Sequence, residues 1–204
     1  KKLTQDHRMD LYPEWSPDGK EFIYERNGEM YSKVDTYEVH LMAADGTNDR
    51  LLTKLPDEAW SFHWSPDGQM IAMDTRSGIK IINRDGSSLK IIAPGGSYSS
   101  VWSPGGKQIA YLGEDKESGS IDIYRLEIGS GQLSKASPPS SLQNQRSQLE
   151  WLPDGHILVL CSGNLYRSNT NPTDDTLTFQ SLTSEGDITW FRVAPDAQKI
   201  LLSR

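Results

Sequence analysis

A five-residue phrase recurs along this chain of 204 residues. Its first positions are separated by 49, 38, 49 and 42 residues, and the last copy has lost both its Trp and its Gly. The copies are Trp15 to Gly19, Trp64 to Gly68, Trp102 to Gly106, Trp151 to Gly155 and Val193 to Ala197. A period near forty residues is the signature of a repeat architecture, in which similar units stack on one another.

One copy of the repeat, read from residue 60 onward, predicts four short strands. The phrase itself has the residues of a tight turn: Pro66 presets φ, Asp67 bonds the local backbone, and Gly68 accepts a positive φ. Short apolar runs follow, and Asp85-Gly86 is a typical hairpin turn. The expected strands cover residues 60–64, 70–73, 79–82 and 89–92. Each repeat is therefore predicted to be one antiparallel sheet of four strands.

The residues that recur in each copy of the phrase are expected to have structural rather than catalytic roles. The indoles are expected to fill the space between neighbouring sheets, and the Asp and Gly residues to shape the turns. These residues are Trp15, Trp64, Trp102 and Trp151, with Asp18, Asp67 and Asp154, and with Gly19, Gly68 and Gly155.

Composition narrows the function classes. The net charge is -7 and the basic residues are scattered, which argues against a nucleic-acid backbone binder. No stretch approaches the roughly 20 apolar residues of a membrane helix. The single cysteine, Cys161, lies in an apolar run and is expected to be a buried small hydrophobe.

The repeat resembles the TolB-like repeat, a WD-type β-propeller unit. The match is carried by residues 41–47 and 51–53, by Trp64 to Met73, and by Trp102 to Tyr111. The resemblance implies one all-β propeller domain over residues 1–204, with repeats that begin near residues 12, 61, 99, 148 and 188. We expect about five blades of four antiparallel strands, four of them complete and the last a thin closing blade. The alternative is part of a six-bladed propeller.

The resemblance implies several functions, because the repeat occurs in protein-binding propellers, in propellers that cap serine peptidases, and in some polysaccharide lyases. We expect a non-catalytic scaffold that binds a protein or peptide partner, is a monomer and needs no cofactor. An accessory propeller of a larger serine hydrolase and a carbohydrate-acting enzyme are the alternatives. By analogy with the family, the protein is expected to be periplasmic or otherwise exported.

The residue before each phrase is the best candidate for a binding site. The family usually has a small residue there, whereas this chain has ionisable residues in four of its five repeats. These strands are expected to lie nearest the central channel, so the side chains would line its mouth. The candidates are Glu14, His63, Glu150 and Arg192, with the nearby aromatic residues Tyr12 and Phe62. The competing interpretation is ion pairing between blades.

The sequence contains no catalytic or metal-binding motif that we recognise. No histidine pair has the spacing of a metal site, and no serine lies in a Gly-x-Ser-x-Gly sequence. Glu14 and Glu150 could face one another across a channel as a carboxylate pair, which keeps glycoside cleavage open as an alternative. We therefore predict that the chain is not an enzyme and holds no metal.

Overall fold

The computed structural model describes residues 2–4, 7–29, 36–115, 117–136, 148–169, 177–194 and 199–204. These residues form strands and turns, and no helix occurs among them. Accordingly, this part of the chain offers no helix long and apolar enough to cross a membrane.

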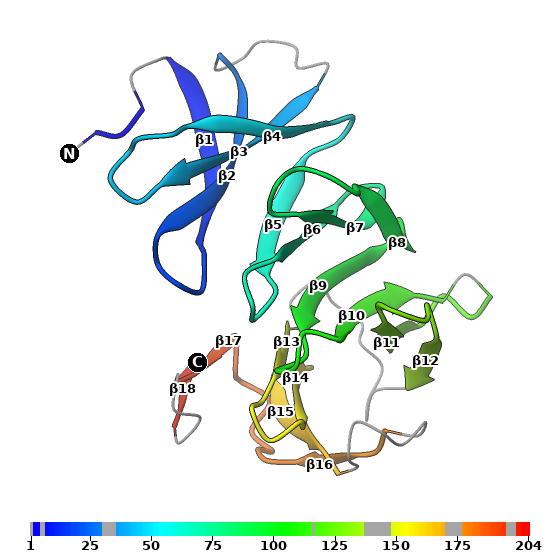
Figure 1. The fold of residues 1–204 in the computed structure, drawn as a ribbon. Helices are drawn as coiled ribbons and strands as arrows, with labels where there is room; N and C mark the ends of the chain where they lie inside the picture. The colour runs from blue at the N-terminus through cyan, green and yellow to red at the C-terminus, as the bar shows by residue number, and fades with distance from the viewer. Residues whose placement is uncertain are drawn as a thin grey trace. The chain divides into compact units, whose positions relative to one another are not determined.

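The strands divide between two compact units, Lys1–Gly96 and Ser97–Arg204. The first unit holds two sheets, each with its strands in chain order (Figure 1). Their strands are β1 Arg8–Trp15, β2 Glu21–Glu29, β3 Tyr37–Ala43 and β4 Arg50–Leu55, and then β5 Ala59–Trp64, β6 Met70–Thr75, β7 Gly78–Asn83 and β8 Lys90–Pro94. All of the neighbouring strands pair antiparallel.

The second unit holds two further sheets of four strands and one pair. The strands are β9 Ser97–Trp102, β10 Gln108–Glu114, β11 Ile121–Glu127 and β12 Leu133–Ala136; β13 Gln148–Trp151, β14 Ile157–Cys161, β15 Asn164–Ser168 and β16 Phe179–Ser181; and β17 Trp190–Val193 with β18 Ile200–Ser203. Four complete sheets and a thin fifth are what the repeat predicts, so that prediction is confirmed for the described residues. The six-bladed alternative stays a prediction.

The recurring phrase forms the turn between the first two strands of each complete sheet, as predicted. In the first copy, Asp18 accepts hydrogen bonds from the Ser16 hydroxyl at 2.8 Å and from the Lys20 backbone N–H at 3.1 Å. Gly19 takes a φ of 66° there, and Gly68 one of 67° in the second copy. Because the aspartates are committed to these turns, their role is structural.

Neighbouring sheets of the first unit meet along their first strands, β1 and β5. Residues of both sheets form one apolar core, in which Ile23 and Leu41 of the first sheet pack with Trp64 of the second. The Trp64 indole N–H donates to the Glu14 carbonyl at 3.3 Å. This is the predicted use of the motif tryptophan, which fills the space between two sheets.

The second unit repeats this packing. Trp151 is buried with residues of the preceding sheet such as Leu112 and Ile123. On the other side of the same sheet, Leu158 and Leu160 pack against Phe191 of the strand pair. Cys161 is 1% exposed within the core, so its assignment as a buried hydrophobe is confirmed.

Trp15 departs from the prediction that every motif tryptophan is buried. Its side chain is 56% exposed, whereas Trp64, Trp102 and Trp151 are each 8% exposed. Among the described residues of its unit no sheet precedes the first, so the face that carries Trp15 has no neighbouring sheet of that unit to pack against. Trp15 instead makes an edge-on contact with Phe22, with ring centroids 5.4 Å apart.

Candidate binding surface on the first strands

In the first unit, the predicted residues Tyr12, Glu14 and His63 lie on the adjacent strands β1 and β5. Tyr12 is 40% exposed and has a φ of 53°, at a break in the β1–β2 register between Leu11 and Glu14. Glu14 is exposed, and a third of the His63 side chain is accessible. Three of the predicted residues thus remain available to a partner.

Phe62 does not belong with them. It is 3% exposed and packs in the apolar core between the two sheets of the first unit. It pairs with Met73 of β6, and that register position directs both side chains into the core. The sequence suggested an exposed aromatic residue here, but Phe62 is buried. Trp60, two residues earlier, would share its face in a regular strand. A register irregularity between Ala59 and Ser61 breaks that alternation, and Trp60 is 39% exposed.

His63 lies in a small polar group that resembles a hydrolytic site only in composition. The Ser61 hydroxyl lies 2.7 Å from His63 Nε2, and the Asp74 carboxylate lies 3.8 Å from the same nitrogen. A Ser–His–Asp triad needs the carboxylate on the opposite ring nitrogen, where it holds the tautomer that accepts the serine proton. The geometry therefore gives no support to a nucleophilic serine.

In the second unit, Glu150 bridges two neighbouring sheets. Its Oε2 accepts a hydrogen bond from the Val193 backbone N–H at 3.3 Å, and burial raises the pKa of its carboxyl group. Gln148 on the same strand also reaches across, donating to the Phe191 carbonyl at 2.9 Å. These side chains replace the missing backbone pairing between first strands. Glu150 thus has a structural role beside the predicted binding role.

Arg192 is exposed, and its guanidinium lies over the Trp190 ring at 5.8 Å from the centroid. Trp190 is itself 40% exposed. The sequence allowed an ion pair between Arg192 and a neighbouring glutamate. The nearby Glu150 instead accepts a hydrogen bond from a backbone N–H. The charge of Arg192 acts only to lower the pKa of Glu150, which burial raises.

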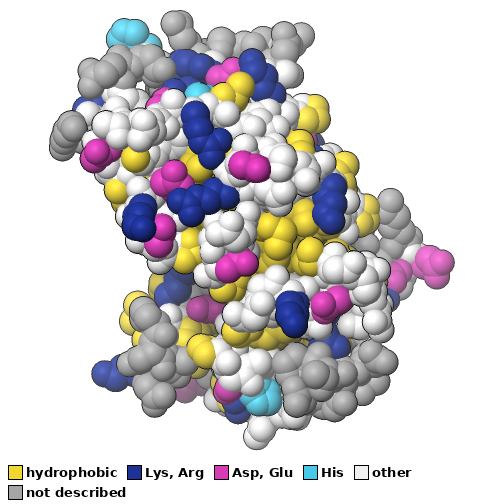
Figure 2. Space-filling model, in the orientation of Figure 1, with side chains coloured by type: hydrophobic (Ala, Val, Ile, Leu, Met, Phe, Trp, Pro, Cys, Tyr) yellow, Lys and Arg dark blue, Asp and Glu magenta, His cyan; other side chains and the backbone are white. Residues whose placement is uncertain are grey.

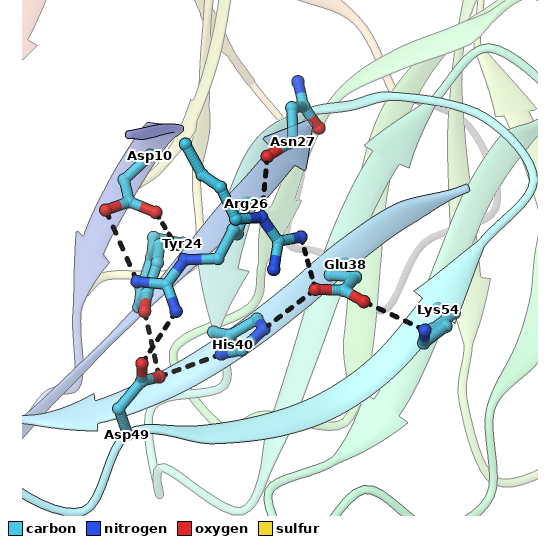
Figure 3. Close-up of polar contacts among 9 residues, drawn as sticks. Asp10, Tyr24, Arg26, Asn27, Glu38, His40, Asp49 and Lys54 are labelled. Atoms are coloured by element: carbon cyan, nitrogen blue, oxygen red, sulfur yellow. Dashed lines mark hydrogen bonds and ion pairs between the residues drawn. The ribbon is translucent and has the colours of Figure 1, made fainter. Parts of the chain in front are cut away.

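A dense polar cluster that the sequence pattern did not predict lies on one face of the first sheet (Figure 3). Arg26 donates to Asp10 and Asp49, both at 2.8 Å, and the Tyr24 hydroxyl donates to Asp49 at 2.9 Å. His40 Nδ1 lies 2.8 Å from the same Asp49 carboxylate.

Glu38 continues this cluster. It pairs with Arg8 and, at 2.9 Å, with Lys54. The hydrogen bonds from Lys54 and Arg8 lower the pKa of Glu38 to about 2. Burial raises the pKa of Asp49, but hydrogen bonds from His40, Tyr24 and Arg26 outweigh it and lower the pKa overall.

Arginine and lysine contribute three cations and aspartate and glutamate three anions to the cluster, which also contains His40 and joins all four strands of the first sheet. The cluster therefore has a structural role, because it holds the four strands together. Alternation along β2 and β3 places Tyr24 with Arg26, and Glu38 with His40, on one face, a signal that the sequence contains. Their partners Asp10 and Asp49 can be identified only once the register of the strands is known.

An open pocket of about 340 Å³ adjoins this cluster, and its lining is mostly apolar. Its lining residues are Leu3, Thr4, Asp10, Pro13, Trp15, Phe22 and Tyr24. This is the face of the first sheet that no other sheet of its unit covers.

Metal chemistry finds no support in the described part of the chain, where no three His, Cys, Asp or Glu residues gather in a way that could hold an ion. The face drawn in Figure 2 shows acidic and basic side chains interspersed, without a large patch of one sign.

No family model matches the sequence, and no curated protein does either. Solved structures do match. TolB from Acinetobacter baumannii is similar with a TM-score of 0.66 and 18% identity, over 96% of this chain and 46% of that one. The β-propeller domain of the Trilobed protease from Pyrococcus furiosus has a TM-score of 0.68 and 15% identity, over 97% of this chain and 64% of that one.

A third similar structure is an oligogalacturonate lyase in complex with manganese, with a TM-score of 0.68 and 15% identity over 98% of this chain and 63% of that one. This chain thus spans 46% to 64% of the length of these three proteins. Identities this low establish a shared fold and carry no activity with them. Together with the four-stranded sheets, these likenesses show that the chain has a β-propeller fold of the kind found in TolB and other TolB-like proteins.

Proposed function

We propose that this chain is a non-catalytic propeller scaffold that binds a protein or peptide partner through the exposed side chains of its first strands. The observation that carries the proposal is the exposure of large aromatic rings beside charged groups on those strands: Tyr12, Trp60 and Trp190 are 39% to 40% exposed. Aromatic residues that could have been buried but stay accessible are typical anchors of protein interfaces.

The chemistry of the site agrees with binding rather than turnover. The serine, histidine and aspartate near β5 lack triad geometry, as described above. Glu150, one member of the carboxylate pair considered for glycoside cleavage, is engaged with the Val193 backbone. The net charge of -7 favours a partner with a basic surface, mainly by raising the association rate. An exported location and a monomeric state belong to the same proposal.

The test is affinity capture from the source cells with purified protein as bait, comparing wild type with the triple variant Glu14→Gln, His63→Ala and Glu150→Gln. A matched control carries the same kinds of change at exposed positions elsewhere: Glu117→Gln, Glu185→Gln and His7→Ala. We expect one stoichiometric protein that wild type and the control retain and the triple variant loses. Equal capture by all three would refute the proposed surface.

A role as the accessory propeller of a larger enzyme is the second candidate, favoured by the likeness to the propeller domain of the Trilobed protease. It predicts that the captured protein, or a further part of the same polypeptide, is a serine hydrolase. Labelling the captured material with a fluorophosphonate probe distinguishes this outcome from a non-enzymatic partner.

A further inference from the structure

Two aromatic rings and two carboxylates lie on or directly before the neighbouring strands β1 and β5. We call Tyr12, Glu14, Glu58 and Trp60 the β1–β5 patch. The Tyr12 hydroxyl donates to Glu58 Oε1 at 3.2 Å, which ties β1 to the residue just before β5. Tyr12 and Trp60 are 40% and 39% exposed, and Glu14 is exposed as well.

A buried carboxylate lies close behind the patch. Glu25 of β2 is 0% exposed, and its Oε2 accepts a hydrogen bond from the Ala59 backbone N–H at 2.6 Å. Its other oxygen, Oε1, is buried and makes no hydrogen bond of standard geometry within the described residues, although the nearby Asn27 side chain acts to lower the pKa of Glu25. Glu25 is near enough to Glu58 and Tyr12 for its charge to act on both. Asp57 adds a further carboxylate.

Two basic groups near the patch are committed elsewhere. Lys80 of β7 is buried and donates to Asp57, Thr75 and Ser77 at 2.6 to 2.9 Å. Arg8, at the start of β1, is bonded to Glu38 and to the Asn27 carbonyl. Among the described residues, no ion pair involves Glu14, Glu25 or Glu58, whereas Arg8 and Lys80 are both paired.

We propose, building on the function proposed above, that the β1–β5 patch binds a lysine or arginine side chain from a basic segment of the protein partner. The exposed faces of Tyr12 and Trp60 offer cation–π contacts, and Glu14 and Glu58 offer carboxylate acceptors. When Glu25 is deprotonated, its buried charge strengthens the negative potential that a cation meets there. A neutral apolar segment would leave these carboxylates desolvated and unpaired, which disfavours it as the occupant.

The direct test uses fluorescein-labelled octapeptides of alternating glycine and lysine, or glycine and arginine, with a glycine–glutamate peptide as the negative probe. Binding is followed by fluorescence anisotropy at low and at physiological salt. We expect saturable binding of the basic peptides. The double variant Glu14→Gln and Glu58→Gln, and separately Trp60→Ala, should weaken it about five-fold or more.

Two matched controls separate the patch from the overall charge. Glu117→Gln with Glu185→Gln removes the same charge at exposed positions of the second unit, and Leu133→Ala removes a large exposed apolar side chain of β12, a strand with no part in the proposed surface. Both should bind the basic peptides as wild type does. If these controls weaken binding as much as the patch variants, or if no basic peptide binds up to millimolar concentration, the inference is wrong.

A third arm asks whether Glu25 acts on the bound cation. Because burial, with Glu58 and Asp57, raises the pKa of Glu25 to about 7, wild type should bind the lysine peptide more tightly at pH 8 than at pH 6. In Glu25→Gln this difference should vanish.

Calcium chloride alone is the control for a metal site. The inference is wrong if calcium binds wild type saturably, fails to bind Glu58→Gln, and displaces the peptide. The patch would then be a metal-cation site. The affinity capture described under the proposed function separates the two proposals. If the patch variants still capture the same partner protein, the proposed function stands and only this inference fails.

Discussion

Glu25 of β2 accepts a hydrogen bond from the Ala59 backbone N–H, 2.6 Å away, at the start of the next sheet. A carboxylate from one sheet therefore satisfies a backbone group of its neighbour where no backbone pairing reaches. The bond is made by a fully buried acid whose pKa is raised from 4.5 to about 7, chiefly by burial.

This raised pKa predicts a pH-dependent stability. The folded chain holds the Glu25 proton more tightly than the unfolded chain does. The stability that Glu25 contributes is therefore complete below about pH 4.5 and is lost as the pH rises through about 7. The difference in unfolding free energy between pH 5 and pH 8 should be smaller in Glu25→Gln by roughly 1 to 3 kcal/mol. Urea unfolding at both pH values measures it, and an unchanged pH dependence would contradict the assignment.

Glu38 should act in the opposite direction in acid. Its pKa is lowered from 4.5 to about 2 by Lys54 and Arg8, so the stability it contributes is complete above about pH 4.5 and is lost as the pH falls toward 2. In Glu38→Gln the loss of stability between pH 5 and pH 3 should shrink by about 1 kcal/mol. Acid titration followed by tryptophan fluorescence tests this, with the exposed Glu117→Gln as control.

The motif tryptophans should differ sharply in energetic weight. Trp64 is 8% exposed within the core of the first unit, so Trp64→Ala should cost about 3 to 5 kcal/mol of unfolding free energy. Trp15 is 56% exposed, and Trp15→Ala should cost less than about 1 kcal/mol. Denaturant unfolding of the two variants decides the point. Similar losses would mean that the Trp15 face is covered in solution.

Two glycines should respond differently to the addition of one methyl group. A Cβ on Gly78, which has a φ of 126°, would lie 2.1 Å from the Ala93 carbonyl oxygen, so Gly78→Ala should abolish or severely weaken folding. A Cβ on Gly105 meets nothing within 4 Å, so Gly105→Ala should leave stability within about 0.5 kcal/mol of wild type. Soluble yield and thermal melting provide the comparison. A stable Gly78→Ala protein would contradict the observed β7–β8 approach.

The sequence alone determined the repeating unit, because its signals are local. The turn that contains Asp67 and Gly68 needs only those residues and their neighbours, and the apolar runs on either side pair through short hairpins. The strand count of each repeat and the structural role of the phrase follow directly. The exposure of Glu14 and Arg192 was also within reach, because ionisable residues stand there at a position where small ones are usual.

Only the tertiary structure decided which faces are covered and which distant groups meet. The five-residue phrase is identical at Trp15 and Trp64, yet one indole is open and the other buried, because burial depends on whether a neighbouring sheet stacks on that face. Strand register brings Asp10, Arg26 and Asp49 together and directs Phe62 inward. The period of the sequence determines the four-stranded repeat, whereas long-range packing and charge pairing depend on which side chains the folded chain brings together.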